Sequence, residues 1–320
     1  MALPKSLEGR LRIPLIGAPM FIVSGPELVI AQCKAGIVGS FPALNARPQP
    51  ALGEWLKQMK DELGEYQEAH PDQVVAPYAV NQIAHASNPR LSDDVETCVE
   101  HEVPIIITSL RPPEDVVTAA HSYGGLVFHD VISLRHARKA IEQGVDGVIA
   151  VCAGAGGHAG NMSPFALVKE IRREFDGAVI LSGCITTGDD VVAALAMGAD
   201  LAYSGTRFIA TDEARAVSDY KKMVVDGKAE DVVYSSLFTG VHGNYLKASI
   251  MNVGLDAENL PEGDKNHMDF SSSDIEAKAW RDIWSAGQGI GTIDEVLPAY
   301  DLVLRMEKEY RDTLARLKAY

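Results

Sequence analysis

His158 is the residue with the clearest chemical potential, because it stands in a loop built almost entirely of glycine and alanine. Residues 154–160 read Gly-Ala-Gly-Gly-His-Ala-Gly and follow an apolar run at 147–151. Glycine lets the main chain approach a ligand closely, at an entropic cost that a purely structural loop rarely carries. An imidazole with a pKa near neutrality can accept a proton from a carbon acid or, when protonated, place a positive charge beside an anion. A tight turn with an incidental surface histidine is the alternative.

Two Ser-Gly motifs could bind a phosphate group. One stands at the end of the strand-like run 178–182 and the other at the end of the run 201–204. Backbone amides, hydroxyls and a helix N-terminus can hold one phosphate without a basic side chain, and parallel barrels commonly use the loops after strands seven and eight in this way. A simple turn explains either motif alone equally well, but both together favour a phosphate site. The candidate contacts are Ser182, Gly183, Cys184, Ser204, Gly205 and Thr206.

The elements that must position these motifs alternate regularly along the chain. Apolar runs rich in β-branched residues predict strands at 14–19, 37–41, 74–80, 105–109, 126–129, 147–151, 178–182 and 201–204. Helical patterns lie at 25–35, 48–63, 92–100, 113–121, 133–143, 164–175 and 187–197. Strands that are apolar on both faces and alternate with helices are typical of a buried parallel sheet. The sequence therefore predicts an α/β fold, a TIM-type (β/α)8 barrel, with function at the carboxyl ends of its strands.

The carboxyl-end rule brings together residues that are far apart in sequence. Besides the histidine loop and the two Ser-Gly motifs, it places Met20, Phe21, Asn81, Ser109 and Asp130 around one opening.

The alternation ends after the eighth strand. Residues 1–211 are predicted to form the barrel, 212–282 a C-terminal helical cap or lid over its mouth, and 283–320 a return segment to the active face and a final helix. Within the cap we expect a helix at 213–225, a mixed stretch at 231–240, the segment 241–245, which contributes cap residues to the site, and a polar loop at 256–273. Residues 283–291 contain too much glycine for a helix interior, and the final helix is predicted at 293–317.

Composition limits the class of protein and its partners. The 320 residues, 47% of them hydrophobic, can bury a large core, and a net charge of -15 without a basic cluster argues against nucleic acid or an anionic membrane as partner. The 4 cysteines form neither a CxxC pair nor a disulfide framework, so we expect no metal site from them. No export signal or apolar run of about 18 residues is present, which predicts a soluble, cytoplasmic protein. Assembly into a homo-oligomer stays open.

Five motifs together resemble the nitronate monooxygenase family, formerly called 2-nitropropane dioxygenases. They are Ala18-Pro19-Met20, Gly156-Gly157-His158, Ser182-Gly183, Gly205-Thr206-Arg207-Phe208 and Trp284-Ser-Ala-Gly-Gln288. Each is short, but their order and spacing between residues 18 and 288 are specific. The resemblance implies a barrel that binds FMN non-covalently and a catalytic role for His158. It puts the phosphate at Gly183, Gly205 and Thr206 and the flavin ring across Ala18, Pro19, Met20, Phe21, Asn81, Gly156 and Gly157.

Asp130 departs from the pattern of related flavoproteins, which often have Lys or Gln at this place. An acidic side chain would leave the N1 side of the flavin without a cation, so that His129 or a backbone amide would have to take that part. Asp130 is kept among the candidate cofactor contacts.

The chemistry that the resemblance implies is oxidation of an alkyl nitronate, or a nitroalkane, by FMN and O2 to a carbonyl compound and nitrite. His158 would orient or deprotonate the substrate, and no nicotinamide is needed. The same scaffold leaves two alternatives open: an NAD(P)H-dependent flavin reductase, either a quinone reductase or an enoyl-ACP reductase, and a non-catalytic flavin-binding barrel. We expect one FMN per chain rather than FAD, because no dinucleotide-type glycine fingerprint follows the first strand.

Overall fold

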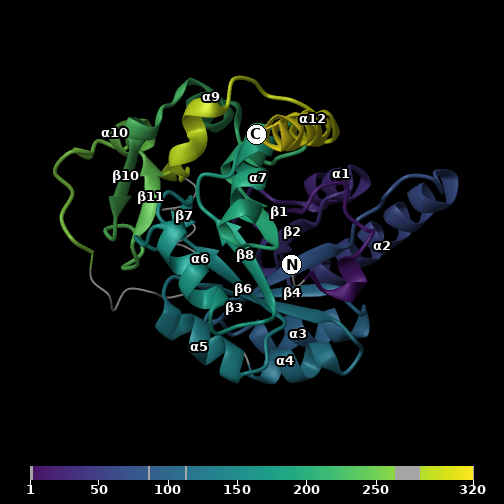
Figure 1. Cartoon of the computed structure of the whole chain (residues 1–320). Helices are drawn as coiled ribbons and strands as arrows, with labels where there is room; N and C mark the ends of the chain where they lie inside the picture. Colours follow the sequence, from purple (N-terminus) through teal and green to yellow (C-terminus); the bar gives the residue numbers. More distant parts are fainter. Residues whose placement is uncertain (1–2, 86, 112–113, 264–281, 320) are drawn as a thin grey trace.

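Eight short strands with almost entirely buried side chains form a parallel barrel (Figure 1). The structure, a computed structural model, describes residues 3–85, 87–111, 114–263 and 282–319. The barrel strands are β1 (Leu15–Gly17), β2 (Gly39–Pro42), β3 (Tyr78–Ala84), β4 (Ile105–Leu110), β5 (Leu126–Val131), β6 (Gly147–Val151), β8 (Ala178–Ser182) and β9 (Leu201–Ser204). Their order is β1-β9-β8-β6-β5-β4-β3-β2. The barrel closes between β1 and β2, where the Gly17 amide donates to the Val38 carbonyl. The predicted parallel barrel is confirmed.

Side chains alternate between the barrel interior and the surrounding helices. On β4, Ile105 and Ile107 belong to the interior cluster, whereas Ile106 belongs to the larger cluster between strands and helices. On β6, Ile149 points inward and Val148 outward in the same way. This period of two is what a sheet closed on itself and covered by helices requires.

Helices on the outside connect successive strands. They are α1 (Pro26–Lys34), α2 (Ala51–Ala69), α3 (Leu91–Glu100), α4 (Glu114–His121), α5 (Leu134–Glu142), α6 (Pro164–Arg172) and α7 (Gly188–Met197), and short helical turns lie at η1 (Lys5–Leu7), η2 (Ala43–Asn45) and α8 (Thr206–Ile209). Pro26 and Pro164 stand in the first turn of their helices, where a missing N–H leaves no bond unmade. The side chain of Thr187 begins α7 through a capping box with Asp190.

The third strand differs most from the sequence prediction, since it runs from residue 78 to 84 rather than from 74 to 80. Pro77 precedes it, and proline cannot donate a hydrogen bond to a neighbouring strand. As a consequence, Asn81 lies within the strand, in register with Pro42 and Ile107, and not after its end. Asp130 likewise lies inside β5.

Residues after the barrel form an insertion with both helices and strands. It contains α9 (Ser218–Asp226), η3 (Ala229–Asp231), β10 (Val232–Ser235), β11 (Gly243–Leu246) and α10 (Lys247–Asn252). Strand β11 pairs with β10 on one side and, on the other, with β7 (Gly157–His158), which is part of the glycine loop. The three strands form an antiparallel sheet beside the barrel (Figure 1). The helix expected from 213 begins only at Ser218, because the Arg215 amide is held by the Val23 carbonyl. Of the polar loop predicted at 256–273, residues 264–273 lie outside the described part of the chain.

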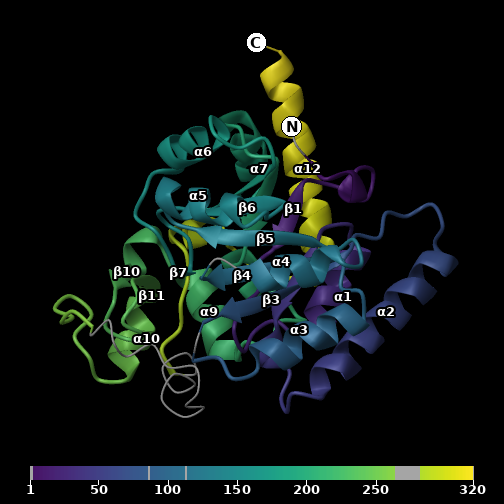
Figure 2. The same cartoon turned by 90° about the horizontal axis from the view of Figure 1, so that it is seen from below.

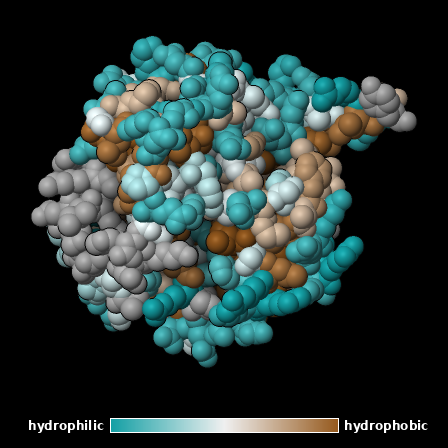
Figure 3. Space-filling model, turned by 90° about the vertical axis from the view of Figure 1, so that its left-hand side faces the viewer, coloured by the Kyte–Doolittle hydropathy of each residue, from teal (hydrophilic) through white to brown (hydrophobic). Residues whose placement is uncertain are grey.

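The last helix, α12 (Ala299–Lys318), follows the turn η5 (Gln288–Thr292) and begins after Pro298 rather than at residue 293. It packs against α7 and α1, and its final turns extend beyond the rest of the barrel (Figure 2). None of the helices in the described residues is long and apolar enough to cross a bilayer. Hydrophobic surface is visible among polar residues on the side that carries α10 and β10 (Figure 3), and the insertion exposes Tyr234, Met251 and Val253.

Candidate active site

The carboxyl ends of the barrel strands open into a cavity of about 780 Å³. This volume falls in the range of roughly 300 to 1,000 Å³ that is typical of ligand and cofactor sites. The sequence-predicted residues that line it are Ala18, Pro19, Met20, Phe21, Asn81, Asp130, Gly156, Gly157, His158, Ser182, Gly183, Cys184, Gly205 and Thr206. The carboxyl-end rule thus located the cavity correctly.

Ser204 is the one candidate residue that the structure places outside the cavity lining. It is 1% exposed, and its Oγ donates to the Ile185 carbonyl at 2.6 Å. The hydroxyl therefore ties β9 to the loop after β8, and its expected role as a direct cofactor contact does not fit this position.

The glycine loop is more regular than its composition predicts. His158 and Gly157 pair with Gly243 and Asn244 of β11, and the Asn244 side chain donates to the Ala155 carbonyl at 2.7 Å. Gly157 has a φ of 68°, which is unfavourable for residues with a side chain. The insertion therefore holds the glycine loop in one conformation. The position of His158 depends on the loop and on the insertion.

His158 is hydrogen-bonded to a residue of the insertion. Its Nε2 lies 2.7 Å from Oγ1 of Thr239, which in turn lies 3.1 Å from the Val241 carbonyl oxygen. Burial lowers the pKa of His158 to about 4, which corrects the expectation of a value near neutrality. The imidazole is therefore neutral at pH 7 and can accept a proton, whereas a positive charge on it would require a nearby anion.

Asn81 and Asp130 are linked by a hydrogen-bonded chain across three adjacent strands. The Asn81 amide donates to Ser109 Oγ at 2.9 Å, and this hydroxyl donates to Asp130 Oδ2 at 2.6 Å. Burial raises the pKa of Asp130 to about 6. Within the described residues neither Asp130 Oδ1 nor the hydroxyl of Tyr203, which also lines the cavity, has a hydrogen-bond partner.

His129 cannot supply the positive charge that a lysine at position 130 would supply. Its Nδ1 is 2.8 Å from the Thr108 hydroxyl, and both side chains are buried in the barrel wall outside the cavity lining. Burial also lowers the pKa of His129 to about 4, so that it is neutral at pH 7.

The two Ser-Gly loops also line the cavity. Gly183 and Cys184 have φ angles of 135° and 56°, so the chain turns sharply after β8. A Cβ at Gly205 would meet nothing closer than the Ala18 Cβ at 3.4 Å, in ordinary contact. Packing with its neighbours therefore does not require glycine at 205, and the space in front of it belongs to the cavity. Thr206 Oγ1 accepts a hydrogen bond from the Gly287 amide at 2.8 Å, which leaves its own proton for another acceptor.

The N-terminus of α7 is not available to a phosphate. Asp190 Oδ2 accepts hydrogen bonds from the Thr186 and Thr187 amides, both at 2.9 Å. The Gly188 amide donates to Glu309 of α12 at 2.8 Å. An anion on this side would therefore bind to the amides of the two loops and not at the N-terminus of α7.

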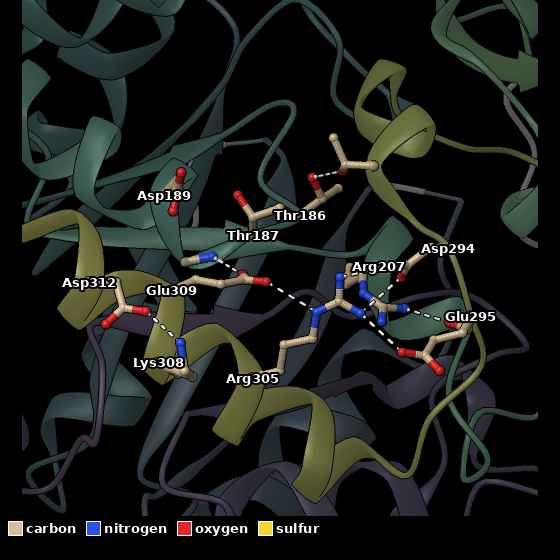
Figure 4. A network of polar contacts seen from close by, with 12 residues as sticks. Thr186, Thr187, Asp189, Arg207, Asp294, Glu295, Arg305, Lys308, Glu309 and Asp312 are labelled. Carbon is tan, nitrogen blue, oxygen red and sulfur yellow. Dashed lines mark hydrogen bonds and ion pairs between the residues drawn. The ribbon is translucent and has the colours of Figure 1, made fainter.

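A polar network fastens the last helix behind these loops (Figure 4). Glu309 accepts a hydrogen bond from Arg305 at 3.1 Å, and Arg305 also pairs with Asp294 at 2.9 Å. The guanidinium of Arg207, directly after Thr206, donates to the Glu295 carbonyl at 3.1 Å. Arg305 of α12 also donates to the Glu295 side chain at 3.1 Å, so the loop after β9 and the helix α7 are both connected to α12, the former through Glu295.

Sequence reasoning missed several residues around the cavity. Arg47, Arg90 and Arg215 line it, and Asp130 is the only carboxylate among the described lining residues. Arg47 lies over the Phe21 ring, and Arg215 pairs with Glu27. These arginines belong to loops without a motif, so no local signal could have found them.

Comparison with known proteins defines the family. The family model described as nitronate monooxygenase matches residues 8–309. This chain belongs to the nitronate monooxygenase family. Members of this family are flavin-dependent oxidoreductases, and the protein is therefore an enzyme of this class with a small-molecule substrate.

Individual relatives agree with this assignment. The nitronate monooxygenase of Paraburkholderia phytofirmans is 26% identical over 349 residues, which cover 96% of this chain and 94% of the relative. A putative monooxygenase of Mycobacterium tuberculosis is 28% identical over 239 residues, but this match spans 70% of this chain and only 64% of the relative's length.

Solved structures of other proteins have the same fold as this member of the nitronate monooxygenase family. FabK of Thermotoga maritima has a TM-score of 0.77 at 24% identity, with 98% of this chain and 97% of that chain covered. The nitroalkane oxidase of Streptomyces ansochromogenes has a TM-score of 0.76 at 23% identity. The match covers 98% of this chain and 100% of that chain.

Proposed function

We propose that this enzyme uses FMN and O2 to oxidise alkyl nitronates to a carbonyl compound and nitrite, and that it accepts nitroalkanes through proton removal by His158. The observation that carries the proposal is the placement of a neutral, hydrogen-bonded His158 in the same cavity as the open space before Gly205. Membership of the nitronate monooxygenase family supports the use of a flavin and the assignment as an oxidoreductase.

The residues present fit an FMN. The absence of a side chain at Gly205 leaves a cradle that a larger residue would fill. Gly183, Cys184, Gly205 and Thr206 would hold the phosphate through backbone amides and the Thr206 hydroxyl. The ring would lie along Ala18, Pro19, Met20 and Phe21, with Asn81, Asp130, Gly156 and Gly157 around it. When bound, FMN supplies the acceptor for the substrate's electrons and the site at which O2 is reduced.

The protein's own part in the reaction is positioning and proton transfer. A neutral imidazole with a depressed pKa stays unprotonated in weak acid and can take the proton from the carbon next to a nitro group. The nitronate that results is an anion, and its charge beside His158 favours the protonated imidazole that has just formed.

We also propose that residues 212–282 act as the substrate cap. Arg215, Ala216, Val217, Tyr220 and Val241 of this segment line the cavity, and Tyr220 stacks on Trp284 of the return segment with ring centroids 5.0 Å apart. These contacts favour a role of the segment in excluding water from the reacting groups.

The electron donor decides between this function and its main rival. Purified protein is examined for a flavin spectrum, and released cofactor is identified by mass spectrometry. Either preformed nitronate or NADH is then added without oxygen. We expect FMN and bleaching by the nitronate; FAD, or bleaching by NADH alone, would contradict the proposal.

An NAD(P)H-dependent flavin reductase is the second candidate, because Arg47, Arg90 and Arg215 line the cavity of an otherwise acidic protein. Guanidinium groups are suited to the phosphates of a nicotinamide dinucleotide. Under this alternative, Arg47→Ala would raise the KM for NADH, while under the first proposal NADH does not reduce the flavin in either protein.

A further inference from the structure

Thr239 comes from the connection between β10 and β11 and reaches His158 across the small antiparallel sheet. The pairing of Gly243 with His158 fixes the register between β11 and β7. The chain leaves β10 in a tight turn in which the Gly240 amide donates to the Ser236 carbonyl at 2.9 Å. Thr239 is 3% exposed. Its hydroxyl is thereby held between the imidazole and the Val241 carbonyl.

The hydroxyl of Thr239 has a single proton for two neighbours. The Val241 carbonyl oxygen, 3.1 Å away, can only accept a hydrogen bond. If the proton goes there, the contact of 2.7 Å with His158 requires Nε2 to donate. The imidazole then has its proton on Nε2 and its lone pair on Nδ1.

We infer that Thr239 is the positioning residue of His158, and that its bond to Val241 holds the imidazole in the Nε2-protonated form. The kinetic part of this inference rests on the proposed function, whereas the tautomer does not. A neutral histidine has two tautomers. The hydrogen bonds that the ring nitrogens make determine which nitrogen carries the proton. Burial, which keeps this imidazole neutral, makes the choice of tautomer relevant at pH 7.

The chain contains a matched control for this arrangement. Thr108 lies 2.8 Å from Nδ1 of His129 and 3.4 Å from the Phe128 carbonyl oxygen. Both residues are buried, but neither lines the cavity. Thr108→Val therefore removes a Thr–His contact of the same type without touching the site.

The test compares Thr239→Val, Thr239→Ser and Thr108→Val with the wild type. Nitrogen NMR of histidine-labelled protein reports the tautomer, and His158→Gln identifies the signal of His158. We expect the Nε2-protonated form in wild type, Thr239→Ser and Thr108→Val, and a mixture of tautomers in Thr239→Val. An Nδ1-protonated His158 in the wild type, or an unchanged tautomer in Thr239→Val, would overturn the inference whatever substrate the enzyme uses.

Kinetics then separate positioning from folding. In Thr239→Val, we expect kcat/KM for a neutral nitroalkane to fall about 10- to 100-fold, as for other partners that orient a reactive group. The rate with preformed nitronate should stay within about threefold, since no proton has to be removed, and flavin content should be unchanged. Serine should restore the nitroalkane rate. An equal loss on both substrate forms, or no rescue by serine, would mean that Thr239 has only a structural role.

Discussion

The two sides of the cavity are built in different ways. The cofactor side consists of the loops after β8 and β9, two neighbouring strands of the barrel, and α12 is fastened behind it. The histidine side depends on β7, which pairs with a strand more than 80 residues further along the chain. Under the proposed function, cofactor binding would thus be a property of the barrel, whereas the acid–base chemistry would depend on the inserted segment. The two should be separable by mutation.

The largest effect should come from filling the cofactor side. In Gly205→Val, the new side chain enters the space proposed for the phosphate, and loss of about two charge-assisted hydrogen bonds corresponds to roughly 100-fold or more in flavin affinity. The barrel should still fold, since a Cβ at this position meets Ala18 at 3.4 Å in ordinary contact. Flavin absorbance per chain and a thermal unfolding curve measure the two quantities. A normal flavin content would place the phosphate elsewhere, and Gly205→Ala provides the graded control.

His158→Ala tests the other side and should leave the flavin in place. With a neutral nitroalkane, the rate should fall about 10²- to 10⁴-fold, the usual contribution of a general base. With preformed nitronate the loss should be much smaller, because the carbon-bound proton is already gone. Steady-state rates on both substrate forms at one pH provide the measurement. Equal activity of the variant and the wild type on both forms would make the loop a packing turn.

The pH dependence sharpens the same comparison. A histidine with an ordinary pKa of 6.5 would be only about one-tenth neutral at pH 5.5. With its pKa lowered to about 4 by burial, His158 stays neutral there, and kcat/KM for a neutral nitroalkane should hold down to about pH 5. Initial rates between pH 4.5 and 8 on wild type, with His158→Ala as the control, test this. An acid limb centred near pH 6.5 that is missing in the variant would contradict it.

Asp130 lies inside β5 and belongs to neither set of loops, and its replacement should have the smallest effect on chemistry. Its folded-state pKa of about 6 is above the usual value of 3.8, so ionisation opposes folding and stability decreases as the pH rises from about 4 through 6. At pH 7.5, Asp130→Asn should therefore raise the free energy of unfolding by about 3 kcal/mol, less the loss of its bond from Ser109. Chemical denaturation at pH 7.5 and pH 4 measures this. A gain of the same size at both pH values would rule out the titration of Asp130 as its cause.

The barrel could be predicted from sequence because its signals are local. Runs such as 147–151 and 178–182 are apolar except for Ser182 and coincide with β6 and β8. The topology of a parallel barrel brings the loops that follow the strands to one face. The position of Gly183 and Gly205 at the cavity could therefore be predicted without knowledge of any long-range contact.

The histidine side could be predicted only in part. Composition singled out His158, but its partner Thr239 is 81 residues away and belongs to a turn with no motif. The pKa of the imidazole depends on how deeply it is buried in the folded protein, and the identity of the residue does not reveal this. Ser204 shows the complementary failure: a motif located the loop, but not the direction in which each side chain of the strand points.

The bond between Gly188 and Glu309 has a consequence for biosynthesis. These residues are 121 positions apart, and at about 5 to 20 residues per second a ribosome needs roughly 6 to 24 s to travel from one codon to the other. During that interval the loop after β8 exists without the carboxylate that anchors its helix. We therefore expect the nascent chain to capture its flavin late, after the barrel strands have emerged, so that the cofactor stabilises a nearly finished protein rather than starting its folding.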